Sequence, residues 1–351
     1  MKLAELTQHA GEWLCGRGPM HDVVISSRAR LARNLAGMPF LTRCTEEQTA
    51  ELEQRLRDEI LRSRIGDDMF YVDVASASDL DRRILVERHL ISRHQADTAH
   101  PRGVAISGDE RIAVMVNEED HLRIQSLRSG LQLEKALEEC MRIDDLLGKR
   151  IDYSYHSRYG YLTACPTNVG TGLRVSVMLH LPALKMTGEI EKAFRAARDM
   201  QLAIRGLYGE GTEASGDFFQ ISNQITLGKT EEQIVDEFLC QTILDFIEYE
   251  RKARQSLVER KGTALDDKIF RAEGILKSCR QISSEETLYL LSLVRLGINL
   301  GRIDSINMKQ VNELFLSTQT GHLQKILDRS MSGGQRDQAR SEFVREKLCA
   351  N

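Results

Sequence analysis

Several features that define large classes of proteins are missing from this sequence. Its seven cysteines include no C-x-x-C pair and their number is odd, so the sequence indicates neither a zinc site nor a disulfide framework. No apolar run is long enough to cross a membrane, and residues 1–16 lack the apolar core of a signal peptide. Reduced thiols in a cytoplasmic protein are the simplest interpretation of these absences.

A strong excess of charge of one sign is absent as well. The formal net charge of −4 argues against a general nucleic-acid or membrane-surface binder but leaves room for a local basic pocket. Hydrophobic residues at 41% and charged residues at 28% are typical of a globular protein. The length of 351 residues allows two or more domains with their own cores.

The familiar glycine- and lysine-based phosphate-binding motifs are also missing. The sequence contains no G-x-x-x-x-G-K-[ST] loop, no G-x-G-x-x-G loop followed by a strand lysine, and no H-R-D motif. Binding of a nucleotide by this chain would therefore depend on other cationic side chains.

The stretch at residues 161–182 is the one around which the other motifs are arranged. An apolar run leads into a turn-rich segment with Gly170 and Gly172, and alternation with a period of two then predicts a strand over residues 175–181. Arg174 stands where the glycine-bearing loop enters this strand. A ligand can approach the backbone closely there, and the guanidinium offers a rigid fork to phosphate oxygens.

Four further arginines stand at junctions between predicted strands and loops. Arg28 and Arg30 share one face of an extended segment, although for this segment alone a solvated basic edge is an equally good interpretation. Arg123 follows an acidic turn, and Arg205 ends a predicted strand before a glycine-rich loop. Together with Arg174 they suit the roughly four negative charges of a nucleotide triphosphate, with Mg²⁺ held mostly by the phosphates themselves.

Two carboxylates on separate loops predict a cationic acceptor. Glu119 belongs to three consecutive acids after a predicted strand at residues 111–116, and Glu210 lies between two glycines. The plain alternative for the first is an acidic surface turn, since repulsion among three acids is tolerable only in water or opposite positive charge. In the functional interpretation both hold a planar guanidinium in place, and one accepts its proton as the new bond forms.

The helix and strand signals predict an α+β fold with a largely antiparallel sheet flanked by helices. Capping boxes at Thr45 and Thr230 each open a helix, and no strand is predicted after Ile225. We therefore expect a catalytic domain over residues 1–254 and an all-helical C-terminal domain over residues 255–351. The predicted helices cover residues 45–64, 79–90, 130–147, 188–200, 230–260, 266–276, 284–296, 308–316 and 335–348, and further strands cover 68–74, 202–205 and 218–225.

Five motifs follow one another along the chain. They are Ser26-Ser27-Arg28-Ala29-Arg30, Asn117-Glu118-Glu119-Asp120-His121-Leu122-Arg123, Cys165-Pro166-Thr167-Asn168-Val169-Gly170-Thr171, Arg174-Val175-Ser176-Val177 and Arg205-Gly206-Leu207-Tyr208-Gly209-Glu210. In this order they resemble the catalytic domain of the phosphagen (guanidino) kinases, over roughly residues 22–250. Within that superfamily the chain most resembles the bacterial protein arginine kinases (McsB). It lacks the N-terminal helical domain of creatine and arginine kinases and carries a helical C-terminal domain that those enzymes lack.

This resemblance implies ATP-dependent phosphorylation of arginine side chains in proteins, with ATP and Mg²⁺ as cofactors and no metal site built from side chains. It makes Glu119 and Glu210 the guanidinium-binding carboxylates and Cys165 a neighbour of the guanidino group, so these three are the expected catalytic residues. The ATP-binding residues that it implies are Ser26, Ser27, Arg28, Ala29, Arg30, His89, Arg123, Arg174, Val175, Ser176, Val177, Met178, Arg205, Gly206, Leu207, Tyr208, Gly209 and Glu210.

The resemblance extends to the last predicted helix. From spacing alone, Arg336 and Arg340 share one helix face and an ordinary solvated charged helix is the favoured interpretation. The segment also matches a family motif, R-D-x-x-R-A, in which Ser341 replaces the alanine. The match implies a regulatory or docking site in which an arginine takes the phosphoryl group of phosphoarginine and Asp337 takes its guanidino end. The residues of this site are Arg336, Asp337, Gln338, Ala339, Arg340 and Ser341.

The partners implied by the resemblance are other proteins. They are arginine-bearing protein substrates, a McsA-like activator and a Clp ATPase or protease that receives the marked proteins, in protein quality control and the stress response. A homodimer or larger homo-oligomer is also implied. No membrane partner and no direct nucleic-acid partner are expected.

Three other functions stay open at this point. A small-molecule guanidino kinase would store phosphate on free arginine or creatine, and the missing N-terminal domain argues against it. A non-catalytic adaptor would bind phosphoarginine with a decayed active site, but the complete set of arginines and glutamates argues against decay. A cysteine nucleophile at Cys165, with His156 or His180 as its base, would leave the arginines without a task.

Overall fold

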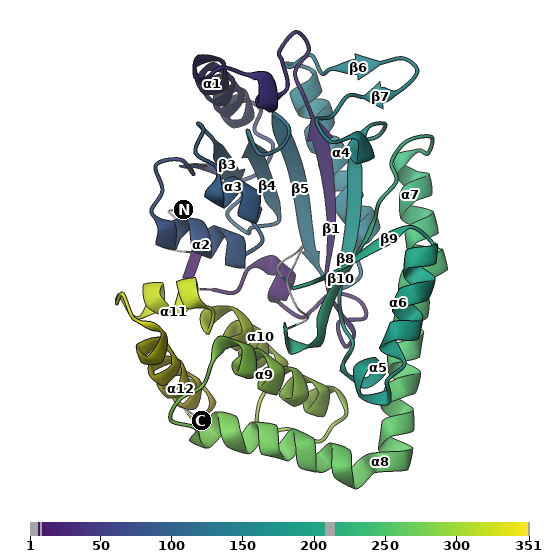
Figure 1. Ribbon diagram of the computed structural model, residues 1–351, viewed down its shortest axis with the longest axis vertical. Helices are drawn as coiled ribbons and strands as arrows, with labels where there is room; N and C mark the ends of the chain where they lie inside the picture. Colours follow the sequence, from purple (N-terminus) through teal and green to yellow (C-terminus); the bar gives the residue numbers. More distant parts are fainter. Residues whose placement is uncertain (1–5, 8, 208–214, 350–351) are drawn as a thin grey trace.

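One eight-stranded antiparallel sheet forms the centre of the fold (Figure 1). The structure is a computed structural model that describes residues 6–7, 9–207 and 215–349. The strand order is β2-β3-β4-β5-β1-β8-β10-β9 and all of these pairs are antiparallel, which confirms the predicted fold class. The strands are β1 (Val24–Arg33), β2 (Phe70–Asp73), β3 (Gly103–Ile106), β4 (Ile112–Val116), β5 (Leu122–Ser129), β8 (Leu173–His180), β9 (Leu202–Gly206) and β10 (Phe218–Asn223), with β6 (Tyr155–His156) and β7 (Gly160–Tyr161) in a separate hairpin.

The register of β1 brings predicted cationic side chains together. β1 pairs with β5 on one edge and with β8 on the other. Arg30 stands directly opposite Arg174 of β8, and Arg28 stands opposite Ser176. Directly opposite residues of antiparallel strands have Cβ atoms about 5 Å apart, where like charges repel. The pairing of these strands therefore concentrates positive charge at the middle of the sheet.

The helices before the C-terminal region are α1 (Glu46–Arg62), α2 (Asp79–Glu87), α3 (Arg93–Asp97), α4 (Leu133–Gly148), α5 (Pro182–Thr187), α6 (Ile190–Asp199) and α7 (Glu231–Phe238). The capping boxes predicted at Thr45 and Thr230 are present and open α1 and α7. Helix α4 packs on β1 and β5. Its Cys140 Sγ lies 3.3 Å from the carbonyl oxygen of Ala29, a residue that alternates with the arginines of β1. The core therefore lies on the face of the sheet opposite those arginines.

The described chain is entirely helical after β10, as predicted. Helix α8 (Leu244–Ser278) bends at Lys261, whose φ of −139° and ψ of 29° are not helical. This bend falls between the two helices that were predicted to end at residue 260 and to begin at residue 266. A short helix after α10 was not predicted, because its seven residues carry no capping box. The remaining helices are α9 (Ser284–Asn299), α10 (Met308–Ser317), α11 (Thr320–Ile326) and α12 (Gly333–Cys349).

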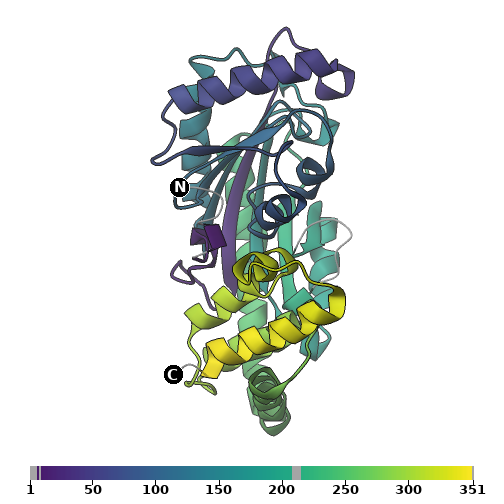
Figure 2. The ribbon, with the colours of Figure 1, turned by 90° about the vertical axis from the view of Figure 1, so that its left-hand side faces the viewer.

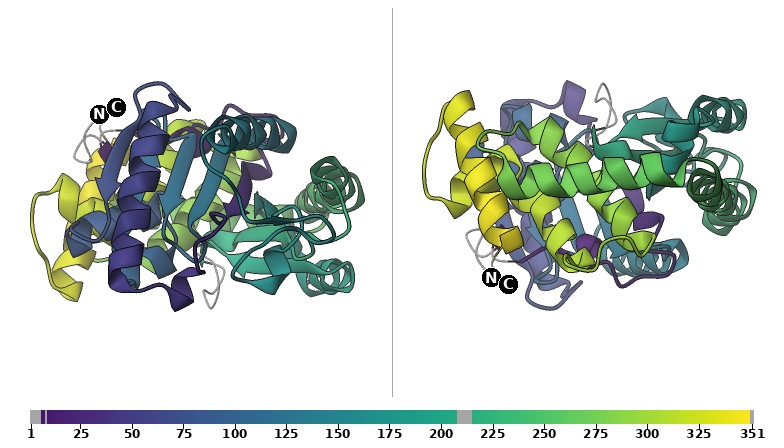
Figure 3. Two further views of the ribbon diagram at one scale, coloured as in Figure 1. Left: turned by 90° about the horizontal axis from the view of Figure 1, so that it is seen from above. Right: turned by 90° about the horizontal axis from the view of Figure 1, so that it is seen from below.

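The C-terminal helices lie at one end of the sheet. Figure 2 shows α1 across the top of the molecule and α12 in its lower part, just above α8, and Figure 3 shows the part of α8 after its bend crossing beneath α9 and α10. Helix α11 packs on α2 of the catalytic part. The division that we propose at residue 255 lies within α8, shortly before its bend. None of the helices in the described ranges combines the length and the apolar character needed to cross a membrane.

Candidate active site

The five predicted arginines, although distant in sequence, line one cavity of about 630 Å³. They project from four strands of the sheet, the adjacent β5, β1 and β8 and, beyond β10, β9. The register of these strands explains why they meet, because each contributes a residue from the same face of the sheet. The predicted site residues in the wall of this cavity are Arg28, Arg30, His89, Glu119, Arg123, Cys165, Arg174, Arg205 and Leu207.

The arginine cluster is short of negative charge. Burial and the repulsion of three other cavity arginines lower the pKa of Arg28 to about 9. Burial and the charge of Arg28 also hold the pKa of Arg30 well below its usual value, with Glu118 opposing them. Depressed arginine pKa values mean that the folded protein holds these charges at a cost, which an anionic ligand would remove.

The acidic turn between β4 and β5 contains two carboxylates with different surroundings. Glu118 is buried, lies 2.7 Å from Arg123 Nη1, and accepts a hydrogen bond of 2.5 Å from Ser92 Oγ. Burial alone would raise the pKa of Glu118, but Arg123, the Ser92 hydroxyl and the backbone N–H of Glu119 hold it below its usual value. The Glu119 side chain is 42% exposed and lies 3.2 Å from Arg123 Nη2. Glu119 is therefore the carboxylate that an incoming cation can reach.

A buried aspartate fastens the acidic turn to the segment that carries Cys165. Asp120 Oδ1 accepts hydrogen bonds from Asn34 Nδ2 at 2.6 Å and from the backbone N–H of Ala164 at 2.7 Å. The Cys165 Sγ atom lies 3.0 Å from Thr167 Oγ1, at the start of a short turn of 3-10 helix. The positions of Glu119 and Cys165 are therefore linked through one oxygen atom.

His89 lies in the cavity wall in a left-handed backbone conformation, with φ of 59°. Its ring packs edge-on against Trp13, with ring centroids 4.8 Å apart, and its carbonyl oxygen accepts a hydrogen bond of 2.8 Å from Gln125 Nε2. Burial and the charge of Arg28 lower the pKa of His89 to about 3. The imidazole is therefore neutral at pH 7 and adds no further positive charge to the cluster.

The other ATP-binding residues implied by the resemblance, so far as the structure describes them, do not line the cavity. Ser27 Oγ donates a hydrogen bond to Gly130 O at 2.8 Å on the far side of the strand, and Ser176 Oγ accepts one from Arg28 Nε at 3.3 Å. Their contact with ATP stays a prediction. The described residues of this group are Ser26, Ser27, Ala29, Val175, Ser176, Val177, Met178 and Gly206. Tyr208, Gly209 and Glu210 lie outside the described residues.

Some residues that shape the site were missed in the sequence. Arg93 and Gln220 line the cavity, but a single arginine at a helix start and a single glutamine in a strand carry no distinguishing pattern. Arg33 faces away from Arg28 because it is an odd number of positions along the strand. It pairs with Asp144 at 2.7 Å and donates to Thr171 O at 2.8 Å, which anchors the Cys165 segment. The alternation of side chains along β1 is the signal in the sequence that places Arg28 and Arg33 on opposite faces of the sheet.

The predicted phosphoarginine motif is half buried against the other C-terminal helices. Arg340 is 1% exposed and donates to Thr318 O at 2.9 Å and to Asp337 Oδ1 at 2.7 Å. Ser341 is also buried. The alternative of an ordinary solvated helix face is therefore wrong for Arg340, because its guanidinium satisfies carbonyl groups of neighbouring elements. Gln338 is exposed, and Arg336 and Asp337 remain partly exposed, so these two are the charged members that a ligand can reach.

We expect replacement of Cys165 with serine to slow phosphoryl transfer about tenfold, equivalent to about 1.4 kcal/mol of barrier, without abolishing it. The thiol lies in the cavity wall, whereas His156 and His180, proposed as bases for a cysteine nucleophile, are not part of that wall. His180 is buried and contacts Ser292 Oγ at 2.8 Å instead. The measurement is kcat at saturating ATP, with Cys44→Ser as the matched control outside the cavity. Complete loss of turnover in Cys165→Ser alone would favour the nucleophile.

Comparison with known proteins agrees with this geometry. Residues 51–253 match the family model of the ATP:guanido phosphotransferase C-terminal catalytic domain, and residues 262–351 match that of the protein-arginine kinase McsB C-terminal domain. A relative from Symbiobacterium thermophilum named protein-arginine kinase is 45% identical over 352 residues, covering 99% of this chain and 99% of the relative. The protein of that name from Bacillus subtilis is 42% identical over 351 residues, covering 99% of this chain and 96% of its own.

Among solved structures, the duplicated taurocyamine kinase from Schistosoma mansoni with bound transition state analog components superposes with a TM-score of 0.60 at 28% identity. The match covers 72% of this chain and 35% of that chain. The fold is therefore that of the phosphagen kinases, and the full-length relatives share both of its regions. The chain belongs to the protein-arginine kinase family, within the ATP:guanido phosphotransferases.

Proposed function

We propose that this protein transfers the γ-phosphoryl group of ATP to the guanidino group of arginine residues in other proteins. The observation that carries the proposal is the cavity in which arginines from four strands surround one space beside Glu119 and Cys165. Phosphoryl transfer is catalysed mainly by positioning and by neutralising the equatorial oxygens of the transferred group. Arginines fixed in a sheet supply both without a change of conformation.

The acceptor guanidinium would enter beside the acidic turn. Glu118 keeps Arg123 in place, so Glu119 can release its longer contact with Arg123 and bind the substrate. A guanidinium nitrogen then forms the bond to phosphorus while the bond to the β-phosphate oxygen of ADP breaks. The nitrogen proton leaves to a carboxylate, for which Glu119 and, by its sequence motif, Glu210 are the candidates.

We propose that Mg²⁺ enters the site with ATP, coordinated mainly by phosphate oxygens. Among the residues that the structure describes, no three histidine, cysteine, aspartate or glutamate side chains gather into a ligand set. Glu118 and Glu119 are both engaged with Arg123. When bound, the ion would add charge neutralisation between the β- and γ-phosphates.

The decisive experiment measures which product forms from γ-labelled ATP. The purified protein is incubated with an arginine-rich protein or with free arginine, and the product is treated with acid. A phosphoramidate on arginine hydrolyses in acid, whereas a phosphoester persists, so we expect acid-labile label on the protein substrate. Label on free arginine alone would contradict the proposal and favour the small-molecule guanidino kinase.

The wider role is proposed from family membership. We infer a cytoplasmic enzyme of protein quality control and the stress response, whose products are passed to a Clp ATPase or protease and whose activity is raised by a McsA-like activator. We also infer a homodimer or larger homo-oligomer. The division into a catalytic domain over residues 1–254 and a helical domain over 255–351 belongs to the same proposal.

We propose that the C-terminal motif binds phosphoarginine through its two partly exposed charged residues, Arg336 and Asp337. Replacing Arg336 with alanine should lower the affinity for phosphoarginine about 10- to 100-fold, since a charge-assisted hydrogen bond is worth about 1.5–3 kcal/mol. Arg340→Ala is a poor test, because this buried residue supports the packing of the helix. Calorimetric titration with phosphoarginine measures the affinity of the wild-type protein and of Arg336→Ala, and Lys347→Ala on the same helix serves as the control. Equal affinities in the two variants would count against the site.

A further inference from the structure

Two buried residues that directly precede His89 are held by helix α11 of the C-terminal region. Glu87 accepts hydrogen bonds from the backbone N–H groups of Gly321 at 2.8 Å and His322 at 3.0 Å. His322 Nδ1 lies 2.7 Å from the same carboxylate, and its Nε2 lies 3.2 Å from Arg88 Nη1. An ionised carboxylate only accepts and a guanidinium only donates, so His322 carries its proton on Nδ1 and is neutral. One imidazole ring thus joins Glu87 to Arg88.

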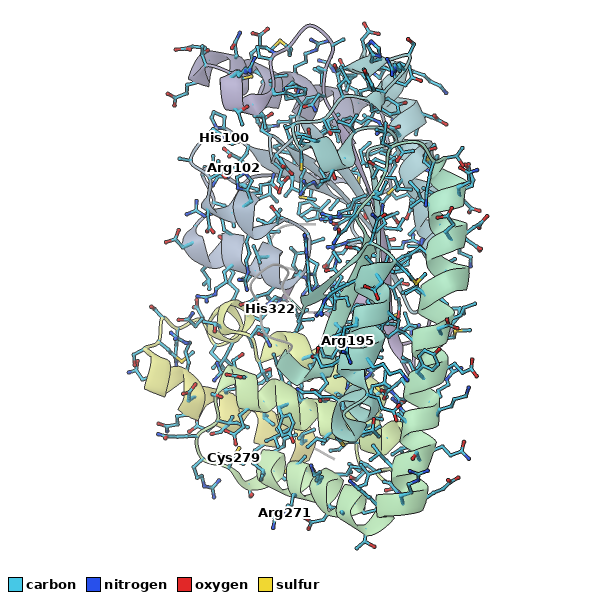
Figure 4. The ribbon with its side chains drawn as sticks, turned by 45° about the vertical axis from the view of Figure 1, so that its right-hand side comes forward. His100, Arg102, Arg195, Arg271, Cys279 and His322 are labelled. Atoms are coloured by element: carbon cyan, nitrogen blue, oxygen red, sulfur yellow. The ribbon has the colours of Figure 1, made fainter. Side chains whose placement is uncertain are left out.

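The contact is close and its polar groups are satisfied. A Cβ atom on Gly321 would lie 2.8 Å from Glu87 Oε2, so a larger residue at this position would push the carboxylate out of its present place. Arg88 is fully buried, and its remaining nitrogens donate to Glu110 at 2.7 and 2.5 Å. A buried network of this kind is rigid when every member has a partner. Figure 4 shows His322 where the C-terminal helices meet the helices above them.

The network ends at the wall of the active-site cavity. The next residue along the chain is His89, whose positive φ is unfavourable for a histidine and persists only when its surroundings fix it. Gln125 holds its carbonyl oxygen from the β5 side, and the bridged pair Glu87 and Arg88 holds its backbone from the α11 side. A displacement of α11 would move Arg88, and the peptide bond between Arg88 and His89 would pass that movement directly to His89.

We propose that His322 is a positioning residue for the nucleotide site, because its bridge between Glu87 and Arg88 keeps His89 in the conformation that the nucleotide requires. The inference rests on the proposed function, since it takes the cavity as the nucleotide site. Burial, opposed by Glu87, lowers the pKa of His322 and so favours the neutral form that the bridge needs. The C-terminal helices are then part of the architecture of the catalytic centre.

The chain contains its own reporter for this coupling. Trp13 is the only tryptophan, and its ring packs against that of His89. Its fluorescence should therefore respond both to ATP and to any displacement of His89. A contact that merely holds two parts of the protein together would affect stability but would leave this emission unchanged.

The test compares full-length variants at His322. In His322→Ala we expect the KM for ATP to rise about 10- to 100-fold, as displacement of a positioned group by about 1 Å can do, with a smaller change in kcat. We also expect the Trp13 emission to change before ATP is added. His322→Gln, whose side-chain oxygen can still accept from Arg88, should give intermediate values. Arg251→Ala, which removes the 2.7 Å pair between α8 and Asp22 and does not involve α11, should change neither quantity.

A wild-type KM for ATP and wild-type emission in His322→Ala would overturn the inference. Should that variant not fold, the same result in His322→Gln would overturn it. Failure of the wild-type protein to bind ATP is a different outcome, because it would refute the proposed function itself.

Discussion

Replacing Arg28 with methionine should nearly abolish phosphoryl transfer and at the same time raise the melting temperature. We expect kcat/KM to fall about a thousandfold, the lower end of the range for arginines that stabilise transferring phosphoryl groups. Stability should rise because burial and three neighbouring arginines depress the pKa of Arg28 to about 9, so at pH 7 it is still charged and the folded state holds that charge unfavourably. If removal of this charge raises the free energy of unfolding by about 1 kcal/mol, Tm should rise by about 2 °C.

The matched control is the same substitution on the other face of the same strand. Arg33 is buried against Asp144, with Arg33 Nη2 2.7 Å from Asp144 Oδ2. Removing it leaves a buried carboxylate without its partner, which costs about 3–5 kcal/mol, so Arg33→Met should lower Tm. Calorimetry and steady-state kinetics on both variants give the comparison. A fall in Tm in both variants would show that the cavity arginines are not under repulsion.

In Glu119→Gln we expect kcat to fall about a hundred- to ten-thousandfold, the range for loss of a general acid or base, while ATP binds as before. Glu119 is exposed to the cavity and makes the longer of the two carboxylate contacts with Arg123. An amide cannot take a proton from the acceptor guanidinium and binds it more weakly than a carboxylate does. The substitution changes few atoms, so the loss should appear in turnover rather than in stability.

The neighbouring glutamate gives the control for this prediction. Glu118→Gln makes the same chemical change one residue away, but Glu118 is buried and fixes Arg123. We expect that variant to raise the KM for ATP and to lower stability. Single-turnover kinetics and ATP titration of both variants separate the two roles. Undiminished turnover in Glu119→Gln would show that this carboxylate does not bind the acceptor.

Local signals accounted for much of the fold and for the chemical character of the site. The capping boxes at Thr45 and Thr230 set helix starts that the structure confirms. The spacing of Arg28 and Arg30 placed both on one face, and both line the cavity. What the sequence could not supply was the register that sets Arg30 opposite Arg174, since the partner of a strand is decided by contacts far away along the chain.

In the C-terminal region, too, the sequence did not predict contacts between residues that are far apart along the chain. The spacing of Arg336 and Arg340 favoured a solvated helix face, but the packing of α12 on other helices buries the second arginine. The bridge of His322 to Glu87 joins residues far apart in sequence, and a lone histidine gives no local sign of such a role. Interactions of this kind depend on tertiary packing, and neither the periodicity of a sequence nor its helix-capping motifs contain information about that packing.

The link through Asp120 has a consequence for how freely this enzyme can vary. The acidic turn that carries Glu119 and the segment that carries Cys165 are tied to one oxygen of Asp120, which also accepts a hydrogen bond from Asn34. A mutation of Asp120 or Asn34 would displace the Glu119 turn and the Cys165 segment together, and no single compensating change in one segment would restore the other. Selection should therefore tolerate less variation at these two hidden positions than at many residues that touch the reactants.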